Sequence, residues 1–509
     1  MKNSFKLASI FTDHMVLQRD AVIPVWGTAQ DGETIGIEFL GAAYETKAHE
    51  GKWHLHLSPV NAGGPYEMKV TNGDGEHILK DILVGEVWVA GGQSNMQMTL
   101  NESLNGRAEA ALADDGNIRY YDVPRIAAEE DAETAAQQEA SWRSCTPETA
   151  GLFSAVAYYF AKKLSKSLDI PIGIIGCNMG GTSASCWMSE KYLASDEDTK
   201  AYLDEYNDYI SKHSEEECAI QTEEFNRRFE EYLKKADVYK AAHPAAGETE
   251  MSRNAGDVPW PPPMSKKSFL RPSGLYHNMV RKIAPYGIKG VIFYQGESDE
   301  HKAGSYGKLF RKMMENWRDD WNNPSLPFLF TQITYYGRGE DPENNVETKG
   351  EEWAVTREQQ LLTSMQDPHT AMAVITDCGE KDNIHPLDKC TVGQRLALLA
   401  EAKIYGLDVP CQGPAYREMR ISGDTATLYF DHAEKGLTAK GEELKGFKVC
   451  GEDKRFVTAN ARIKGNTVEV SGEGIEAPVA VRYGFANYSC ANLFNMDGLP
   501  ASPFRTDHL

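Results

Sequence analysis

Residues 87–94 combine an apolar run, two glycines and a serine, a pattern suited to nucleophilic chemistry. Residues 87–90 are apolar, Gly91 and Gly92 follow, and Ser94 comes next but one. The glycines allow a tight turn and a close approach of the backbone to a substrate. A serine after the carboxyl end of a strand lies where open α/β sheets bind their ligands. The segment is not a G-x-S-x-G elbow, because Met96 stands where the second glycine would be.

Three later segments carry polar groups that would complete a site around this serine. They are residues 175–183, 291–299 and 377–386. The first two end apolar runs and offer hydrogen-bond donors, from Gly180 or Gly181 and from Gln295. The third is a loop before a helix, and it offers a base with a carboxylate nearby, His385 and Asp382.

These groups are the parts that acyl transfer requires. A serine hydroxyl is a weak nucleophile until a histidine removes its proton. The histidine needs a carboxylate that fixes its tautomer and stabilises the imidazolium. The tetrahedral intermediate needs donors aimed at its oxyanion. Asp377, at a strand end, is an alternative to Asp382 as the carboxylate, and the sequence leaves that choice open.

Strand and helix patterns alternate from residue 82 to residue 405, which predicts a parallel sheet with helices on both faces. The predicted strands include residues 172–175, 290–294, 327–333 and 371–376, and the clearest helices are residues 154–164 and 391–403. Short strand patterns flank this α/β domain on both sides. We therefore expect a β-sandwich-like domain at 1–81, the catalytic domain at 82–405 and a second β-sandwich-like domain at 406–509.

A highly charged insertion interrupts the catalytic domain at about residues 190–272. Phe225, Phe229, Tyr232 and Ala236 recur at helical spacing on a background rich in Glu, Lys and Arg, which indicates helices with one buried face. Segments carried on a rigid scaffold commonly supply substrate contacts. We expect this insertion, together with Tyr276, to select among substrates.

Composition restricts the class of partner. The chain has 509 residues and a net charge of −22, which argues against nucleic acid or an anionic membrane surface. No apolar stretch reaches the length of a membrane span, and residues 1–13 lack the apolar core of a signal peptide. The nine cysteines are scattered without a C-x-x-C pair, which suits reduced thiols. We expect a cytoplasmic protein, with homo-oligomer formation left open.

The order of the motifs resembles the SGNH (GDSL-type) hydrolases and, within them, the sialate O-acetylesterase family. The motifs are Met15-Val16-Leu17-Gln18-Arg19, Pro24-Val25-Trp26-Gly27, Gly92-Gln93-Ser94-Asn95-Met96, Gly180-Gly181-Thr182, Tyr294-Gln295-Gly296-Glu297-Ser298, Ile384-His385-Pro386 and Leu499-Pro500-Ala501-Ser502-Pro503-Phe504-Arg505. This resemblance runs from about residue 11 to about residue 507 and leaves only the insertion poorly covered. Each motif is weak alone, but seven in the same order are specific.

The resemblance implies an SGNH-hydrolase-like fold and a role for each motif. It implies Ser94 as the nucleophile and His385 as the base. The Ser94 N–H, a glycine of the Gly180-Gly181 pair and Gln295 would form the oxyanion hole. Members of the family often carry an acid two residues before the histidine, where this chain has Asn383.

Five further residues are expected to contact the substrate, namely Asn95, Tyr294, Glu297, Arg357 and Tyr276. Arg357 matches a Trp-to-Arg-Glu pattern of the family. A structural role for Glu297, satisfying a strand end, is equally compatible with the sequence.

The function implied is a serine carbohydrate O-acetylesterase that needs no metal or cofactor. Its substrate would be an acetylated sugar, either sialic acid or a xylo- or manno-oligosaccharide. One alternative is a non-catalytic carbohydrate-binding protein, although that would not require Ser94, Gln295 and His385 together. The other is an esterase for a non-sugar acetyl ester.

Overall fold

The computed structural model describes residues 5–73, 75–128, 140–243, 246–337 and 350–507, and the chain divides into two compact units. The first unit comprises Met1–Lys212, Met264–Gln295 and Leu309–Leu329. The second comprises His213–Pro263, Gly296–Lys308 and Phe330–Leu509. The N-terminal strands and the segment of Ser94 therefore belong to the first unit, and the segment of His385 belongs to the second.

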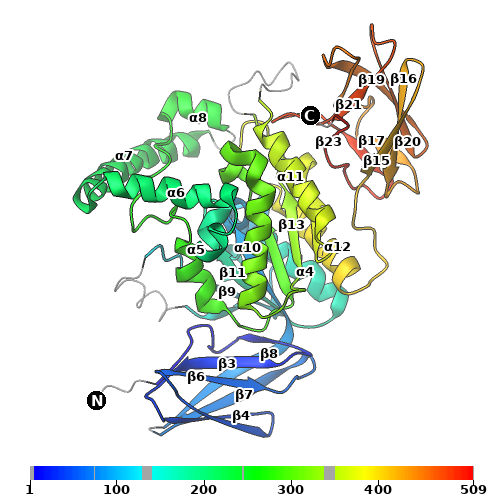
Figure 1. Ribbon diagram of the computed structural model, residues 1–509. Helices are drawn as coiled ribbons and strands as arrows, with labels where there is room; N and C mark the ends of the chain where they lie inside the picture. The colour runs from blue at the N-terminus through cyan, green and yellow to red at the C-terminus, as the bar shows by residue number, and fades with distance from the viewer. Residues whose placement is uncertain (1–4, 74, 129–139, 244–245, 338–349, 508–509) are drawn as a thin grey trace. The chain divides into compact units, whose positions relative to one another are not determined.

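At the N-terminal end of the first unit, strands in which buried and exposed residues alternate form one small sheet and the first part of a larger one (Figure 1, blue). One sheet contains β1 (Lys6–Leu7), β3 (Ile23–Thr28) and β6 (Lys52–Leu57), in that order. In the other, β4 (Thr34–Phe39) pairs with β5 (Ala42–Lys47) and β7 (Gly63–Asn72), and β7 pairs with β8 (Gly75–Gly92). Short strands therefore occupy this region, as the sequence pattern predicted.

β8 is one long strand that leads from the N-terminal sheets to the serine. Its first half pairs with β7, its middle pairs with β2 (Val16–Gln18), and residues 86–92 pair with β11 (Ile172–Asn178). The predicted boundary between residues 81 and 82 thus falls inside a continuous strand. Glu86 stabilises β8 where its partner changes from β2 to β11. Its buried carboxylate accepts hydrogen bonds from Arg19 Nε at 2.6 Å and Gln18 Nε2 at 2.9 Å.

The central sheet of the first unit is parallel around β8. β11 lies between β8 and β9 (Asp115–Asp122), and β12 (Gly290–Tyr294) pairs with the other edge of β8. β10 (Trp142–Cys145) runs antiparallel to β9. β11 and β12 are buried along their whole length, as expected for parallel strands covered on both faces. The predicted strands at 172–175 and 290–294 are confirmed.

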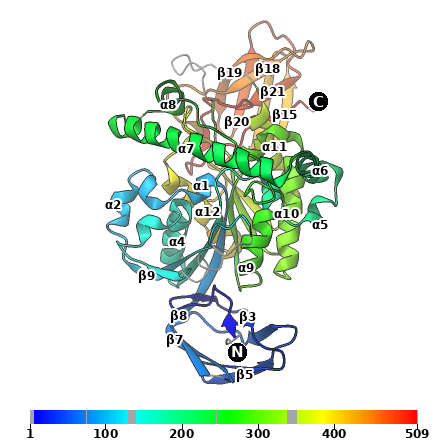
Figure 2. The same ribbon diagram turned by 90° about the vertical axis from the view of Figure 1, so that its left-hand side faces the viewer.

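Helices pack on this sheet and link its strands. α4 (Ala155–Leu168) starts after Ser154, whose hydroxyl accepts the Ala157 N–H, and packs against β9 and β11 (Figure 2). The other helices of this unit are α1 (Ser94–Gln97), η1 (Leu100–Glu102), α2 (Gly106–Ala110), η2 (Ala150–Leu152), η3 (Ala184–Trp187), α5 (Glu190–Leu193), α6 (Glu197–Lys212), η4 (Tyr276–Val280) and α9 (Arg281–Ile283). α10 (Tyr306–Asp320) and β13 (Phe328–Gln332) each have residues in both units.

The second unit continues the α/β pattern and then changes to β-structure. Its α/β elements are η5 (Glu297–Ser305), α11 (Glu352–Gln366), β14 (Thr370–Val374), η6 (Thr376–Cys378), α12 (Lys389–Leu399) and η7 (Ala400–Ile404). The predicted strands at 327–333 and 371–376 and the predicted helix at 391–403 are therefore confirmed.

The C-terminal strands form a seven-stranded sheet in the order β15-β16-β20-β19-β18-β21-β23 and a separate pair, β17-β22 (Figure 1, orange to red). Their bounds are β15 (Ala415–Ser422), β16 (Thr425–Asp431), β17 (Leu437–Ala439), β18 (Phe447–Cys450), β19 (Val457–Lys464), β20 (Thr467–Gly472), β21 (Ala480–Tyr483), β22 (Leu493–Asn495) and β23 (Phe504–Arg505). Residues 499–505, the last of the seven sequence motifs, bond this sheet to α11 and β13. Arg505 contacts Glu358 through two hydrogen bonds of 2.8 and 2.9 Å, and Ser502 Oγ contacts the Gln332 side chain.

The described residues of the insertion form several helices, the last of which ends at Ala255. In the second unit it contributes α7 (Glu215–Ala242) and α8 (Glu248–Ala255), which pack together. α7 starts with a capping box in which Ser214 accepts the Glu217 N–H and Glu217 accepts the Ser214 N–H. On α7, Ala236 is buried and Phe225, Phe229 and Tyr232 are half-buried, so the predicted apolar stripe is the less exposed face. Among the described residues, no helix has both the length and the hydropathy to cross a membrane.

Candidate active site

Ser94 stands at the end of β8, on a turn that only glycine permits. Gly92 has a φ of +132°, and a Cβ at this position would lie 2.1 Å from the Tyr294 carbonyl oxygen. The same carbonyl accepts the Gln93 N–H at 3.0 Å, so β12 holds the chain just before the serine. Ser94 then begins α1 and is partly exposed, whereas Asn95 and Met96 after it are buried. The turn therefore presents Ser94 to solvent on a rigid base.

The Gly180-Gly181 pair lies against this serine. A Cβ on Gly180 would be 3.2 Å from the Ser94 Cβ, and the Gly180 N–H donates to Gln97 Oε1 at 2.7 Å. Gly181 has a φ of +72°, which favours glycine there. The pair thus brings a backbone donor beside Ser94, and in this structure the Gln97 side chain accepts from it.

Gln295, the residue that follows β12, contacts the same turn. Its side chain is 1% exposed, and its Nε2 donates to the Thr182 carbonyl at 3.2 Å and to Gln93 Oε1 at 3.4 Å. The first unit therefore brings Ser94, the glycine pair and Gln295 together. Both amide hydrogens of Gln295 have acceptors here, so a contact with an oxyanion would require one of them to be exchanged.

His385 lies in a loop of the second unit, between η6 and α12, and is partly exposed. Its N–H donates to Asn383 Oδ1 at 3.0 Å, which closes a short side-chain turn. Asn383 Nδ2 donates to Glu380 Oε2 at 3.0 Å, and Glu380 Oε1 accepts the Leu387 N–H at 2.7 Å. Asn383, where the family often has an acid, is therefore part of the loop framework.

The two candidate acids differ in their surroundings. Asp377 forms two hydrogen bonds with the Arg395 guanidinium, at 2.5 and 2.8 Å, and both side chains are largely buried. Asp382 accepts the Thr249 N–H on Oδ2 at 2.9 Å and the Thr249 hydroxyl on Oδ1 at 2.5 Å. A carboxylate has about four acceptor positions, so Asp382 retains capacity for a further donor. Asp377 is instead the partner of a buried cation.

The expected substrate contacts at Arg357 and Tyr276 are not supported by their placement. Arg357 is 0% exposed, lies over the Tyr335 ring, and donates to the carbonyls of Thr334 and Ala486. Burial lowers the pKa of Arg357 to about 10, which leaves the guanidinium charged at neutral pH. Its role is to tie α11 to the loop after β21. Tyr276 is buried too, and its hydroxyl donates to Asp320 Oδ1 at 3.1 Å.

Asn95, Tyr294 and Glu297, the other three expected contacts, are also buried, at 1%, 0% and 5% exposure. Tyr294 acts through its backbone carbonyl, which positions Gln93. For Glu297 the sequence left a functional and a structural role open. The structure shows its carboxylate acting on the buried Lys389 ammonium, an electrostatic interaction that raises the pKa of that lysine against the effect of burial.

Comparisons with known proteins place the chain in a family. A family model described as a carbohydrate esterase, sialic acid-specific acetylesterase, matches residues 262–401. The sialate O-acetylesterases of Mus musculus and Homo sapiens are each 25% identical to this chain over 98% of its length, covering 94% and 92% of the relatives. A solved carbohydrate acetylesterase from Xanthomonas citri is 32% identical, with a TM-score of 0.77, over 99% of this chain and 100% of that one. The chain belongs to the sialate O-acetylesterase family. It is therefore a carboxylic ester hydrolase.

One buried residue close to His385 gave no signal in the sequence. Lys389, at the start of α12, is fully buried, and its Nζ donates to the Pro386 carbonyl at 2.6 Å, next to His385. Lysine is almost never fully buried, so no sequence pattern would have placed it there. Burial lowers the pKa of Lys389 to about 8, and the Glu297 carboxylate opposes this shift.

The low pKa of Lys389 predicts how stability depends on pH. In the unfolded chain a lysine keeps its proton to about pH 10.4. From about pH 8 upward the unfolded chain therefore binds more protons than the folded one, so this group makes the folded state more stable as pH rises. We measure the free energy of unfolding of the native chain minus that of Lys389→Met. We expect this difference to rise by up to about 3 kcal/mol between pH 8 and pH 10.4. Urea unfolding at a series of pH values measures this difference, and a constant difference would contradict it.

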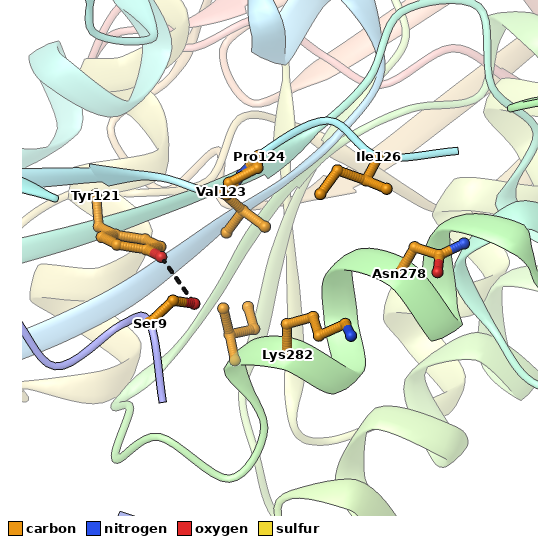
Figure 3. Close-up of a pocket in the computed structure, with 8 residues that line it drawn as sticks. Ser9, Tyr121, Val123, Pro124, Ile126, Asn278 and Lys282 are labelled. Atoms are coloured by element: carbon orange, nitrogen blue, oxygen red, sulfur yellow. Dashed lines mark hydrogen bonds between the residues drawn. The ribbon is translucent and has the colours of Figure 1, made fainter. Parts of the chain in front are cut away.

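The pocket drawn in Figure 3 belongs to the first unit and lies apart from these contacts. It is lined by Ser9, Tyr121, Val123, Pro124, Ile126, Asn278, Lys282 and Ile283. The Tyr121 hydroxyl lies 3.5 Å from Ser9 Oγ across it. None of the predicted site residues lines this pocket, so we do not assign it to the binding of an ester substrate. Among the described residues, no group of three or more His, Cys, Asp or Glu is arranged to hold a metal ion.

Proposed function

We propose that this esterase removes O-acetyl groups from an acetylated sugar, with Ser94 as nucleophile, His385 as general base and Asp382 as the acid that orients the histidine. The observation that carries the proposal is the partly exposed Ser94 on its glycine turn, with the Gly180 N–H beside it. The named relatives, sialate O-acetylesterases and a carbohydrate acetylesterase, support sugar O-deacetylation as the class of reaction.

The proposed reaction is a double displacement. As Ser94 Oγ attacks the acetyl carbonyl carbon, His385 takes the hydroxyl proton. The bond from the carbonyl carbon to the sugar oxygen then breaks, His385 returns the proton to that oxygen, and acetyl-Ser94 remains. In the second half, His385 takes a proton from water, the water oxygen attacks the acetyl carbonyl carbon, and acetate leaves as the proton returns to Ser94 Oγ. These steps use only side chains and backbone donors of the chain.

The position of Gln97 supports a site for the oxyanion. Its Oε1 accepts the Gly180 N–H at 2.7 Å, close to the Ser94 side chain. A carbonyl oxygen that becomes negative in the transition state is a stronger acceptor than an amide oxygen. We infer that the substrate oxygen replaces Gln97 on this N–H, with the Ser94 N–H and Gln295 as the other proposed donors.

The choice of Asp382 rests on what surrounds the two candidates. An acid that orients a histidine must keep an acceptor position for the ring N–H. The Asp377 carboxylate is held at both oxygens by the buried Arg395 guanidinium. Asp382 is three residues from His385, and its carboxylate is held by one threonine.

The SGNH-type fold with flanking β-sandwiches is part of this proposal, and parallel pairing around β8 supports it. A reducing compartment is also proposed. Its support is that the nine cysteines, all among the described residues, are free thiols.

The proposal predicts a strong preference for short acyl groups. Gly180 lies against Ser94, so an acyl chain with additional methylene groups on that side of the serine would meet the protein. We expect kcat/KM for 4-nitrophenyl acetate to exceed that for the butyrate by on the order of 100-fold, because each unaccommodated methylene is penalised in the transition state. Initial rates with the two esters provide the measurement, and equal values would contradict the assigned acyl pocket.

The alcohol side of the substrate needs a separate assay. Acetate release is measured from O-acetylated sialic acid, acetylated xylo-oligosaccharide and acetylated manno-oligosaccharide, at matched ester concentration. A sugar ester with kcat/KM above that of 4-nitrophenyl acetate supports a sugar substrate. If all three are poorer than the synthetic ester, the alternative of a non-sugar acetyl ester replaces it.

A further inference from the structure

The loop that carries His385 is bound by a helix of the insertion, far away in sequence. Glu248 is the first residue of α8, and its Oε1 accepts the Ile384 N–H at 2.7 Å. Its Oε2 accepts the Tyr336 hydroxyl proton at 2.6 Å. The peptide N–H bound by Glu248 is the one immediately before His385, so this carboxylate fixes the backbone at the base.

The first turn of α8 also binds Asp382. The Glu248 N–H donates to the Asp382 carbonyl at 2.8 Å, and Thr249 donates to both oxygens of the Asp382 carboxylate. The first N–H groups of a helix have no partner inside the helix, and a carboxylate is a favourable acceptor for them. Asp382 therefore caps α8, and α8 in return sets the direction of the carboxylate.

Close approach of the two segments depends on Gly247, the residue before α8. A Cβ on Gly247 would lie 2.6 Å from Asp382 Oδ2 and 3.2 Å from the Asp382 carbonyl. Its φ of −77° is accessible to any residue, so the glycine is required here for space and not for backbone conformation.

We propose that α8 is the element that positions the catalytic loop, with Glu248 and Thr249 as positioning residues that act through His385 and Asp382. This inference rests on the proposed function, because it takes those two residues as the base and the orienting acid. The insertion then does more than select among substrates, since its last helix completes the catalytic machinery.

The physical reason is the short reach of proton transfer. A base works only when it lies within hydrogen-bonding distance of the hydroxyl that it deprotonates. His385 is on a partly exposed loop, and such loops are mobile unless other segments hold them. The Glu248 carboxylate holds Ile384, and the Glu248 N–H and Thr249 hold Asp382, so the loop is restrained on both sides of Asn383.

The test compares Glu248→Ala with Glu250→Ala on the full chain. Glu250 lies on the same helix, is exposed, and bonds Tyr239 within the insertion, so it is a matched control. With 4-nitrophenyl acetate we expect kcat of Glu248→Ala to fall on the order of 100-fold with KM nearly unchanged, as for a displacement of about 1 Å. Glu250→Ala is expected to retain the kcat of the native chain.

Two further variants separate positioning from loss of folding. Glu248→Gln keeps an oxygen for the Ile384 N–H and an amide donor for the Tyr336 hydroxyl, so it should restore most of kcat. Thr249→Val removes the hydroxyl donor at constant shape, and it should lower kcat without lowering the fraction of chains that urea unfolding shows to be folded. All rates are divided by that folded fraction, which does not depend on the activation of Ser94.

The outcomes are distinct. Equal kcat per folded chain for Glu248→Ala and Glu250→Ala would overturn the positioning role of α8. A loss in Glu248→Ala that Glu248→Gln fails to restore would overturn it too, because the lost bonds would not be the cause. If the native chain hydrolyses no acetyl ester at all, the proposed function fails instead, whatever the variants do.

Discussion

Replacing Ser94 by alanine is expected to lower kcat for acetyl ester hydrolysis by about 10⁴- to 10⁶-fold, because loss of the nucleophile of a serine hydrolase leaves only the effect of the oxyanion donors and of binding. Folding should be unaffected. Ser94 is partly exposed, and the glycine turn before it is held by backbone bonds that do not involve its hydroxyl. Initial rates with 4-nitrophenyl acetate and the urea unfolding midpoint provide the two measurements.

Ser211→Ala is the matched control for this experiment. Ser211 is an exposed serine on α6 in the same unit, and its hydroxyl donates only to the Asp208 carbonyl one turn earlier. Its kcat should equal that of the native chain. A Ser94→Ala protein with most of its activity intact would show that another residue is the nucleophile.

The second large effect is expected at Asp382. Asp382→Asn should lower kcat by up to about 10⁴-fold, because an amide no longer holds the histidine in the tautomer that accepts a proton. Stability should change little, since an asparagine oxygen still accepts from Thr249 at the start of α8. Rates per folded chain, with the folded fraction taken from urea unfolding, separate the two properties.

Asp377→Asn should behave in the opposite way. Arg395 is largely buried and forms two bonds with Asp377, so removing the negative charge leaves a buried cation without its counter-ion. Breaking such a pair destabilises a protein by up to about 3–5 kcal/mol. The folded fraction of Asp377→Asn should nevertheless keep its kcat. If instead kcat falls more in Asp377→Asn than in Asp382→Asn, the roles of the two acids must be exchanged.

The predicted elements of the catalytic region came from local patterns. Residues 87–90 are apolar because β8 is covered on both faces, and the following glycines are required because the Tyr294 carbonyl leaves no room for a Cβ at Gly92. Such features leave a trace in a short window of sequence. The placement of Ser94 at a strand end therefore could be predicted from neighbouring residues alone.

Long-range polar contacts were the part that the sequence could not supply. Arg357 was expected at the substrate, yet it is buried and bonded to the carbonyl of Ala486, more than a hundred residues later. The continuity of β8 through residues 81 and 82 was missed for a similar reason. The two halves of β8 pair with different strands, β7 and β11. In the sequence, this change of partner gives a change of pattern like that at a domain boundary.

The sequence by itself determined the segment of Ser94, the run of strands and helices, the helical insertion and the family, because each depends on residues close together in the chain or on an ordered set of motifs. Only the tertiary structure decided which acid is committed to Arg395, which lysine is buried beside His385, and that α8 binds the loop of His385. Each of these depends on pairs of side chains that folding brings together, such as Glu248 with Ile384 and Thr249 with Asp382. The neighbouring sequence of each partner is like that of an ordinary solvated residue. Burial and charge pairing arise only when the chain is folded.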